Sequence, residues 1–131
     1  MNRMLKLIAG CTLAFAGIMM AAEDAPADHV QWMKDLGKQM GAMRKGVDVQ
    51  KNATDMQATL KLVGGFWKKR NSDIAMKTCG ETYKGAAAVA KAAAADDKEG
   101  IAGGMKQMGA GCKGCHDAHR EKVGEHEYKI K

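Results

Sequence analysis

Residues 101–119 read IAGGMKQMGAGCKGCHDAH. Apolar, sulfur-bearing and histidine side chains recur along this stretch in steps of four and three residues. Their positions are Ile101, Met105, Met108, Cys112, Cys115 and His119. This spacing places them on one face of an amphipathic helix, and such a face packs against other helices. The stretch therefore predicts the last helix of a bundle, with both cysteines continuing its buried face.

The same stretch contains the pattern C-x-x-C-H at residues 112–116, which is the attachment signature of c-type haem. Two thiols at this spacing add across the two vinyl groups of one porphyrin, and the adjacent imidazole binds the iron. We therefore expect one covalently bound haem c. Cys112 and Cys115 are its expected thioether attachment points, and His116 is the expected proximal iron ligand.

A zinc site is a second interpretation of these residues, because zinc takes nitrogen and sulfur ligands. Its four ligands would be Cys112, Cys115, His116 and His119. Consecutive positions on one helix do not surround a metal tetrahedrally, however, and no second ligand pair is present in the sequence. The pattern favours haem.

Helical spacing appears three more times before this stretch. A first helix is expected from the N-cap Asp28 to residue 44, and a second from residue 49 to 67. A third begins at Ser72 or Asp73 and runs to residue 95, and Asp96-Asp97 caps the fourth. The charged tail breaks at Gly124, and no stretch alternates with a strand period. Together these patterns predict an all-α fold, an antiparallel four-helix bundle with covalently attached haem.

The N-terminus resembles a secretory leader. Arg3 and Lys6 precede an apolar, uncharged run over residues 7–21, which is too short for a comfortable transmembrane helix. We expect residues 1–22 to be a signal peptide and residues 23–131 to be the bundle domain. The alternatives are an uncleaved leader, which would hold the protein at a membrane, and a lipoprotein box ending at Cys11.

Export agrees with the haem motif, because bacteria attach haem to C-x-x-C-H outside the cytoplasm. The expected location is the periplasm. Without its leader the chain has 19 basic residues (21 minus Arg3 and Lys6) against 15 acidic ones, a net charge of +4. No basic patch is interleaved with aromatic residues, so nucleic-acid binding is not expected. Cys79 is left without an assigned role, either as a small buried thiol or as a dimer contact.

The position and the surroundings of the motif resemble those of class II c-type cytochromes, the cytochrome c′ family. The run GCKGCHDAHR at residues 111–120 is similar to that family's C-K-x-C-H-x-x-[YF]-R ending, with His119 where the family usually has an aromatic residue. The resemblance implies that Arg120 lies near the haem, where it either neutralises a propionate or pairs at the surface. It also makes a homodimer an option.

The resemblance leaves the second axial position of the iron open. Residues 33–40 are similar to the first-helix segment of the low-spin branch, and Met33 falls on its iron-ligand position. A methionine on an amphipathic face is also commonly a core residue. The alternatives are an open iron face, or ligation by Met40, His29 or another residue.

These observations predict an exported monohaem cytochrome that carries single electrons between periplasmic redox partners, whose docking surfaces would be acidic. The second hypothesis is a five-coordinate protein that binds nitric oxide or carbon monoxide. The third is a haem-free helical protein that binds metal or a partner. No Ser-His-Asp set, phosphate loop or pair of carboxylates in a catalytic pattern appears, so an enzyme is not expected.

Overall fold

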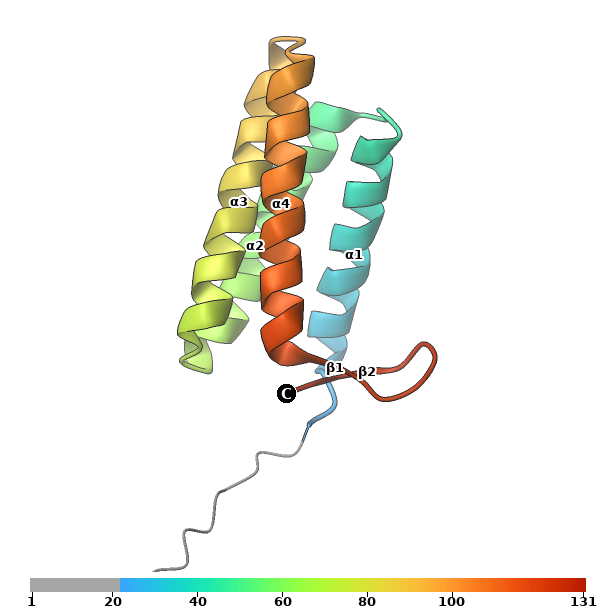
Figure 1. Cartoon of the computed structure of the whole chain (residues 1–131), viewed down its shortest axis with the longest axis vertical. Coiled ribbons are helices and arrows are strands. Elements are labelled where there is room, and N and C mark those ends of the chain that lie inside the picture. The colour runs from blue at the N-terminus through green and yellow to red at the C-terminus, as the bar shows by residue number, and fades with distance from the viewer. Residues whose placement is uncertain (1–21) are drawn as a thin grey trace, which may run out of the picture.

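The computed structural model describes residues 22–131, and the chain is mostly helical over that range. Four helices pack against each other, as expected for a helical bundle (Figure 1). They are α1 (Ala27–Arg44), α2 (Val49–Lys69), α3 (Asp73–Ala94) and α4 (Lys98–His119). The predicted signal peptide, including Cys11, lies outside the described residues except for Ala22. No helix within residues 22–131 is both long and apolar enough to span a bilayer.

Local capping explains the starts of two helices. The Ser72 hydroxyl accepts a hydrogen bond from the backbone N–H of Ala75 at 3.2 Å, and the Asp97 carboxylate accepts one from Gly100 at 2.9 Å. Both residues satisfy a backbone donor that the first helical turn leaves free. The prediction of Asp28 as an N-cap is wrong: α1 begins one residue earlier, after Pro26. Asp28 lies inside the first turn, where its negative charge favours the helix dipole.

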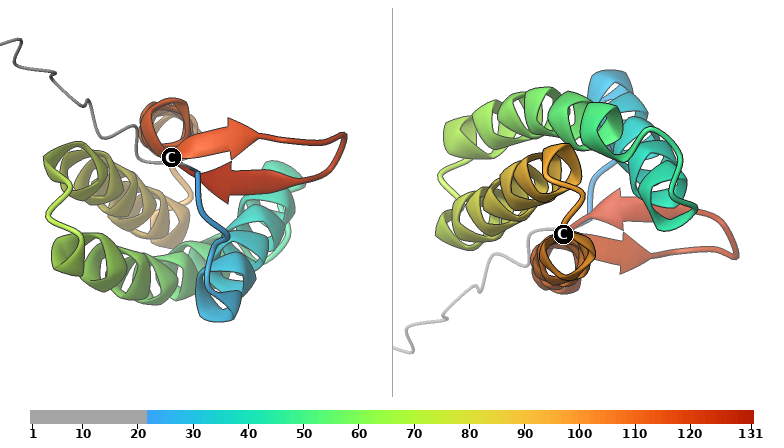
Figure 2. Two further views of the ribbon diagram at one scale, coloured as in Figure 1. Left: turned by 90° about the horizontal axis from the view of Figure 1, so that it is seen from below. Right: turned by 90° about the horizontal axis from the view of Figure 1, so that it is seen from above.

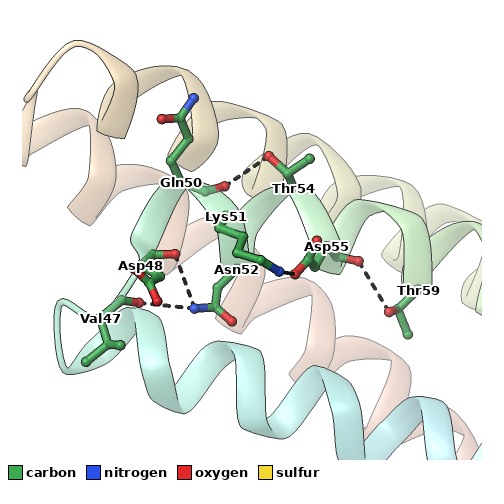
Figure 3. Close-up of polar contacts among 8 residues, drawn as sticks. All are labelled: Val47, Asp48, Gln50, Lys51, Asn52, Thr54, Asp55 and Thr59. Carbon is green, nitrogen blue, oxygen red and sulfur yellow. Dashed lines mark hydrogen bonds and ion pairs between the residues drawn. The ribbon is translucent and has the colours of Figure 1, made fainter.

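The turn between α1 and α2 contains two residues in the left-handed backbone region, Gly46 and Asp48. The Asn52 side chain donates hydrogen bonds to the carbonyls of Val47 at 3.1 Å and Asp48 at 3.2 Å, which closes this turn (Figure 3). Val47 lies in this turn and is 51% exposed.

Helices α3 and α4 approach each other closely through glycines. A Cβ atom on Gly104 would lie 2.6 Å from Val89 Cγ2 and 2.9 Å from the carbonyl oxygen of Gly85. One turn along α4, Met108 fills the contact and is fully buried. The innermost residues of α4 are therefore Gly104, Met108 and Gly111, whereas Cys112 and Cys115 are half-buried beside them.

On α3, Ala75 is fully buried, while the adjacent Met76 is 38% exposed. Cys79 lies on the buried face as predicted. Helix α2 carries the buried row Ala53, Met56, Leu60, Val63 and Trp67 that its spacing predicted, and it continues past Trp67 to Lys69.

A short β-hairpin follows α4, where the sequence predicted only a charged tail. Strands β1 (Arg120–Lys122) and β2 (Tyr128–Ile130) pair antiparallel, with Arg120 opposite Ile130. Glu23 adds an isolated bridge to Ile130 through hydrogen bonds of 2.8 and 2.9 Å. The hairpin lies across the end of the bundle where α1 starts and α4 ends (Figure 2). Strands of three residues are too short to reveal a two-residue period.

Candidate functional site

A cavity of about 720 Å³ opens between α1 and α4. These two helices make few direct contacts, because α1 packs mainly on α2 and α4 packs mainly on α3. Side chains of α2 and α3 form the back of the cavity, and the C-terminal hairpin borders it. Its volume lies in the range of about 300–1,000 Å³ that is typical of ligand and cofactor sites.

The α4 wall of the cavity contains all three residues of the predicted haem-attachment motif. Cys112, Cys115 and His116 line it together, and each is half-buried. Both cysteines are free thiols. Burial raises the pKa of each thiol above its usual value, and the neighbouring Thr82 and Thr78 hydroxyls oppose this in part. Burial therefore favours the protonated form of both thiols.

The surroundings of His116 favour its neutral form. Burial lowers the pKa of its imidazole, and the positive charge of Arg120 lowers it further. The nearby His29 acts in the same direction, while Asp117 opposes it. A neutral imidazole has a free lone pair, which a metal requires.

The α1 wall carries the predicted distal residue, Met33, which lines the same cavity and is half-buried. The structure therefore brings Met33 and His116 to one cavity from helices on opposite sides of it. Met40, the alternative ligand from the same helix, also lines the cavity but is 8% exposed and belongs to the core.

Two glycines leave room in this cavity. Gly37 of α1 and Gly109 of α4 both line it, and a Cβ atom on either would have no heavy atom within 4 Å. The remaining lining is largely apolar: Leu36, Met40, Met56, Leu60 and Val63. An apolar space with a few convergent polar groups suits a large flat ring such as a porphyrin.

His29, which the sequence offers as an alternative iron ligand, is a buried residue of the cavity wall. It lines the cavity from the first turns of α1, is 6% exposed, and its Nδ1 has no hydrogen-bond partner. Its ring packs 4.4 Å from the Phe66 ring and 5.9 Å from the Trp67 ring, measured between centroids. Burial lowers the pKa of this imidazole. A buried, unpaired polar atom is uncommon in native proteins and indicates a missing partner.

Arg120 begins β1 and lines both the large cavity and a second pocket of about 360 Å³. The second pocket also carries the cationic side chains of Lys122 and Lys131. The Arg120 guanidinium lies 4.2 Å from the centroid of the Tyr128 ring, which keeps it at the cavity border. These cations suit the carboxylates of a bound group, so the residues present fit a haem with its propionates at the hairpin end.

His119 has a structural role. Its Nε2 lies 2.7 Å from the Ser72 hydroxyl and its Nδ1 lies 3.1 Å from the carbonyl oxygen of Lys131. Its ring packs 4.3 Å from the Trp67 ring. These contacts join the end of α4 to the turn between α2 and α3 and to the last residue of the chain. Both ring nitrogens of His119 are therefore engaged in hydrogen bonds, whereas the zinc interpretation requires one of them as a metal ligand.

The zinc interpretation finds no support in the arrangement of side chains. Across residues 22–131, no group of three or more His, Cys, Asp or Glu side chains is placed to hold a metal ion together.

Cys79 is a buried thiol that donates a hydrogen bond to the Leu60 carbonyl at 3.3 Å. Burial, with smaller contributions from Cys115 and Cys112, raises the pKa of this thiol to about 11. Cys79 also lines the cavity, which places it at the site rather than on the surface where a dimer contact would require it.

Comparisons of this chain with protein-family models, curated proteins and solved structures find no match.

Proposed function

We propose that this chain is an exported monohaem c-type cytochrome that carries single electrons between periplasmic redox partners. One observation carries the proposal: the cavity between α1 and α4 is lined by the complete C-x-x-C-H motif on one side and by Met33 on the other. Class II c-type cytochromes, which the motif and its C-terminal position resemble, are the family we propose for it.

Five residues of the chain have separate roles in holding the cofactor. Cys112 and Cys115 supply the two thiols for covalent attachment, and His116 supplies a neutral imidazole as proximal ligand. Met33 supplies the thioether for the opposite side, and Arg120 neutralises a propionate at the hairpin end. Haem with a histidine and a methionine axial ligand is a one-electron carrier of raised reduction potential.

The surrounding residues limit what else reaches the site. Met56, Leu60 and Val63 present a dry apolar back wall, and all three are nearly inaccessible to solvent. A site with an apolar lining favours the less charged, reduced state of a bound iron centre. Lys34, an exposed lysine at the cavity, suits an acidic partner surface.

The test is spectroscopic and uses the full chain expressed with a haem-attachment system. Reversible one-electron reduction, a low-spin spectrum and a thioether–Fe(III) charge-transfer band that disappears in Met33→Leu would support electron transfer. A five-coordinate high-spin spectrum that shifts with carbon monoxide would instead support the gas-binding alternative. A protein without haem would support the haem-free one.

A further inference from the structure

Besides Met40, which belongs to the core, the α1 wall of the cavity holds two groups that can bind iron, and only Met33 has a proposed role. The other is His29, which lies one helical turn earlier and therefore on the same face of α1. It lines the cavity, is almost fully buried, and has a ring nitrogen without a hydrogen-bond partner.

The level of His29 along the bundle matches that of His116. Figure 1 shows the start of α1 beside the end of α4, with both near the hairpin. Counted from that end, His29 is two residues into α1, Met33 is six residues in, and His116 is three residues into α4. At about 1.5 Å of rise per residue these offsets are roughly 3, 9 and 4.5 Å. His116 therefore lies between the levels of His29 and Met33 along the bundle, and all three side chains line the same cavity.

The orientation of His29 is restricted by aromatic neighbours. The rings of Trp32, Phe66 and Trp67 surround it, with centroid distances of 6.1, 4.4 and 5.9 Å. A ring packed in this way keeps its orientation without a hydrogen bond to hold it. An imidazole that lines a cavity and is held in one orientation by packing is suited to bind a group inside that cavity.

We propose that His29 is a second distal ligand, which binds the haem iron through a ring nitrogen when the Met33 thioether is absent or displaced. The inference rests on the proposed function and deepens it. The exchange breaks one iron–sulfur bond and forms one iron–nitrogen bond, with no change in the number of electrons. Because the two residues are one turn apart, only one of them binds at a time.

The experiment compares four holoproteins made from the full chain: wild type, Met33→Leu, His29→Phe, and the double variant. Leucine and phenylalanine conserve most of the packing, so both sites keep their volume. Met40→Leu serves as a matched control, because Met40 is another methionine of α1 that lines the cavity. The readouts are ferric electron paramagnetic resonance and the near-infrared ligand-to-iron charge-transfer bands.

We expect Met33→Leu to lose the thioether band, stay low-spin and acquire the signature of two imidazole ligands. The double variant should then become high-spin and bind carbon monoxide at least tenfold faster than Met33→Leu. His29→Phe and Met40→Leu should keep the thioether band.

Two results would overturn the inference while leaving the cytochrome proposal intact. One is a high-spin Met33→Leu protein, which shows that nothing replaces the thioether. The other is a double variant that stays low-spin, which shows that a different residue binds. A wild-type chain without covalent haem would overturn the proposed function itself, and this inference with it.

Discussion

Two adjacent glycines of α4, Gly103 and Gly104, test the close packing that positions the site helix. A Cβ atom on Gly104 would lie 2.6 Å from Val89 Cγ2, 2.9 Å from the Gly85 carbonyl oxygen and 3.0 Å from the Val89 backbone nitrogen. Two of these three atoms belong to the backbone, so α3 and α4 must separate to accept an alanine. A Cβ atom on Gly103 would have no heavy atom within 4 Å.

The two substitutions to alanine should therefore act in opposite directions. Both gain about 1 kcal/mol of helix propensity. Only Gly104→Ala overpacks a tight contact, which costs about 1–3 kcal/mol by itself and more where backbone atoms must move. We expect Gly103→Ala to stabilise the protein by roughly 0.5–1 kcal/mol, and Gly104→Ala to destabilise it by about 1–2 kcal/mol after the propensity gain is subtracted.

The assay is chemical and thermal unfolding of wild type and both variants, followed by far-ultraviolet circular dichroism in one buffer and in the same haem state. For a domain of this size the difference between the variants corresponds to a shift in Tm of about 5–15 °C. Equal stability of the two variants, or a more stable Gly104→Ala protein, would refute the close approach of α3 and α4.

Three further predictions concern other contacts of the site. Ser72→Ala removes both an N-cap and a hydrogen-bond partner of His119, so denaturant unfolding should show a loss of about 1–2 kcal/mol, whereas Ser72→Thr, which keeps the hydroxyl, should lose less. Cys79, whose pKa is raised to about 11, should react with iodoacetamide at pH 8 far more slowly in the folded protein than in urea, as measured by mass spectrometry; equal rates would contradict its burial. Burial lowers the pKa of His29 below its usual 6.5, so the unfolded chain takes up a proton more readily than the folded one. The free energy of unfolding should therefore fall as the pH drops below 6.5. If His29→Phe leaves this pH dependence unchanged, His29 is not its source.

The sequence predicts the helices well because helix caps and the spacing of apolar residues can be recognised within one short segment of the chain. Ser72 and Asp97 cap the helices that they precede, and the spacing of Met56 and Leu60 follows one face of α2. The close approach at Gly104 could not be predicted, because a glycine has this role only when another helix supplies the opposing atoms. The hairpin could not be predicted either, because its three-residue strands are stabilised by pairing with each other and with Glu23.

The sequence indicates the residues of the α4 wall of the candidate site together, but those of the α1 wall only in part. Cys112, Cys115 and His116 are adjacent in the chain, so their shared position follows from one helical turn. The opposite wall depends on how α1 packs on α2, which turns the face shared by His29 and Met33 toward the cavity. His29 shares a helical face with Met33, but the rings of Phe66 and Trp67 that bury it belong to α2 and lie far from it in the sequence.

Covalent attachment of haem by Cys112 and Cys115 inside the bundle is the property on which the proposed function depends. It is measured by the intact mass of the denatured protein together with its pyridine haemochrome spectrum, after expression of the full chain with a haem-attachment system. We predict one haem per chain that remains bound after denaturation, and none in the Cys112→Ser/Cys115→Ser variant. Wild-type protein with no bound haem, or with haem that acid and organic solvent extract, would contradict it.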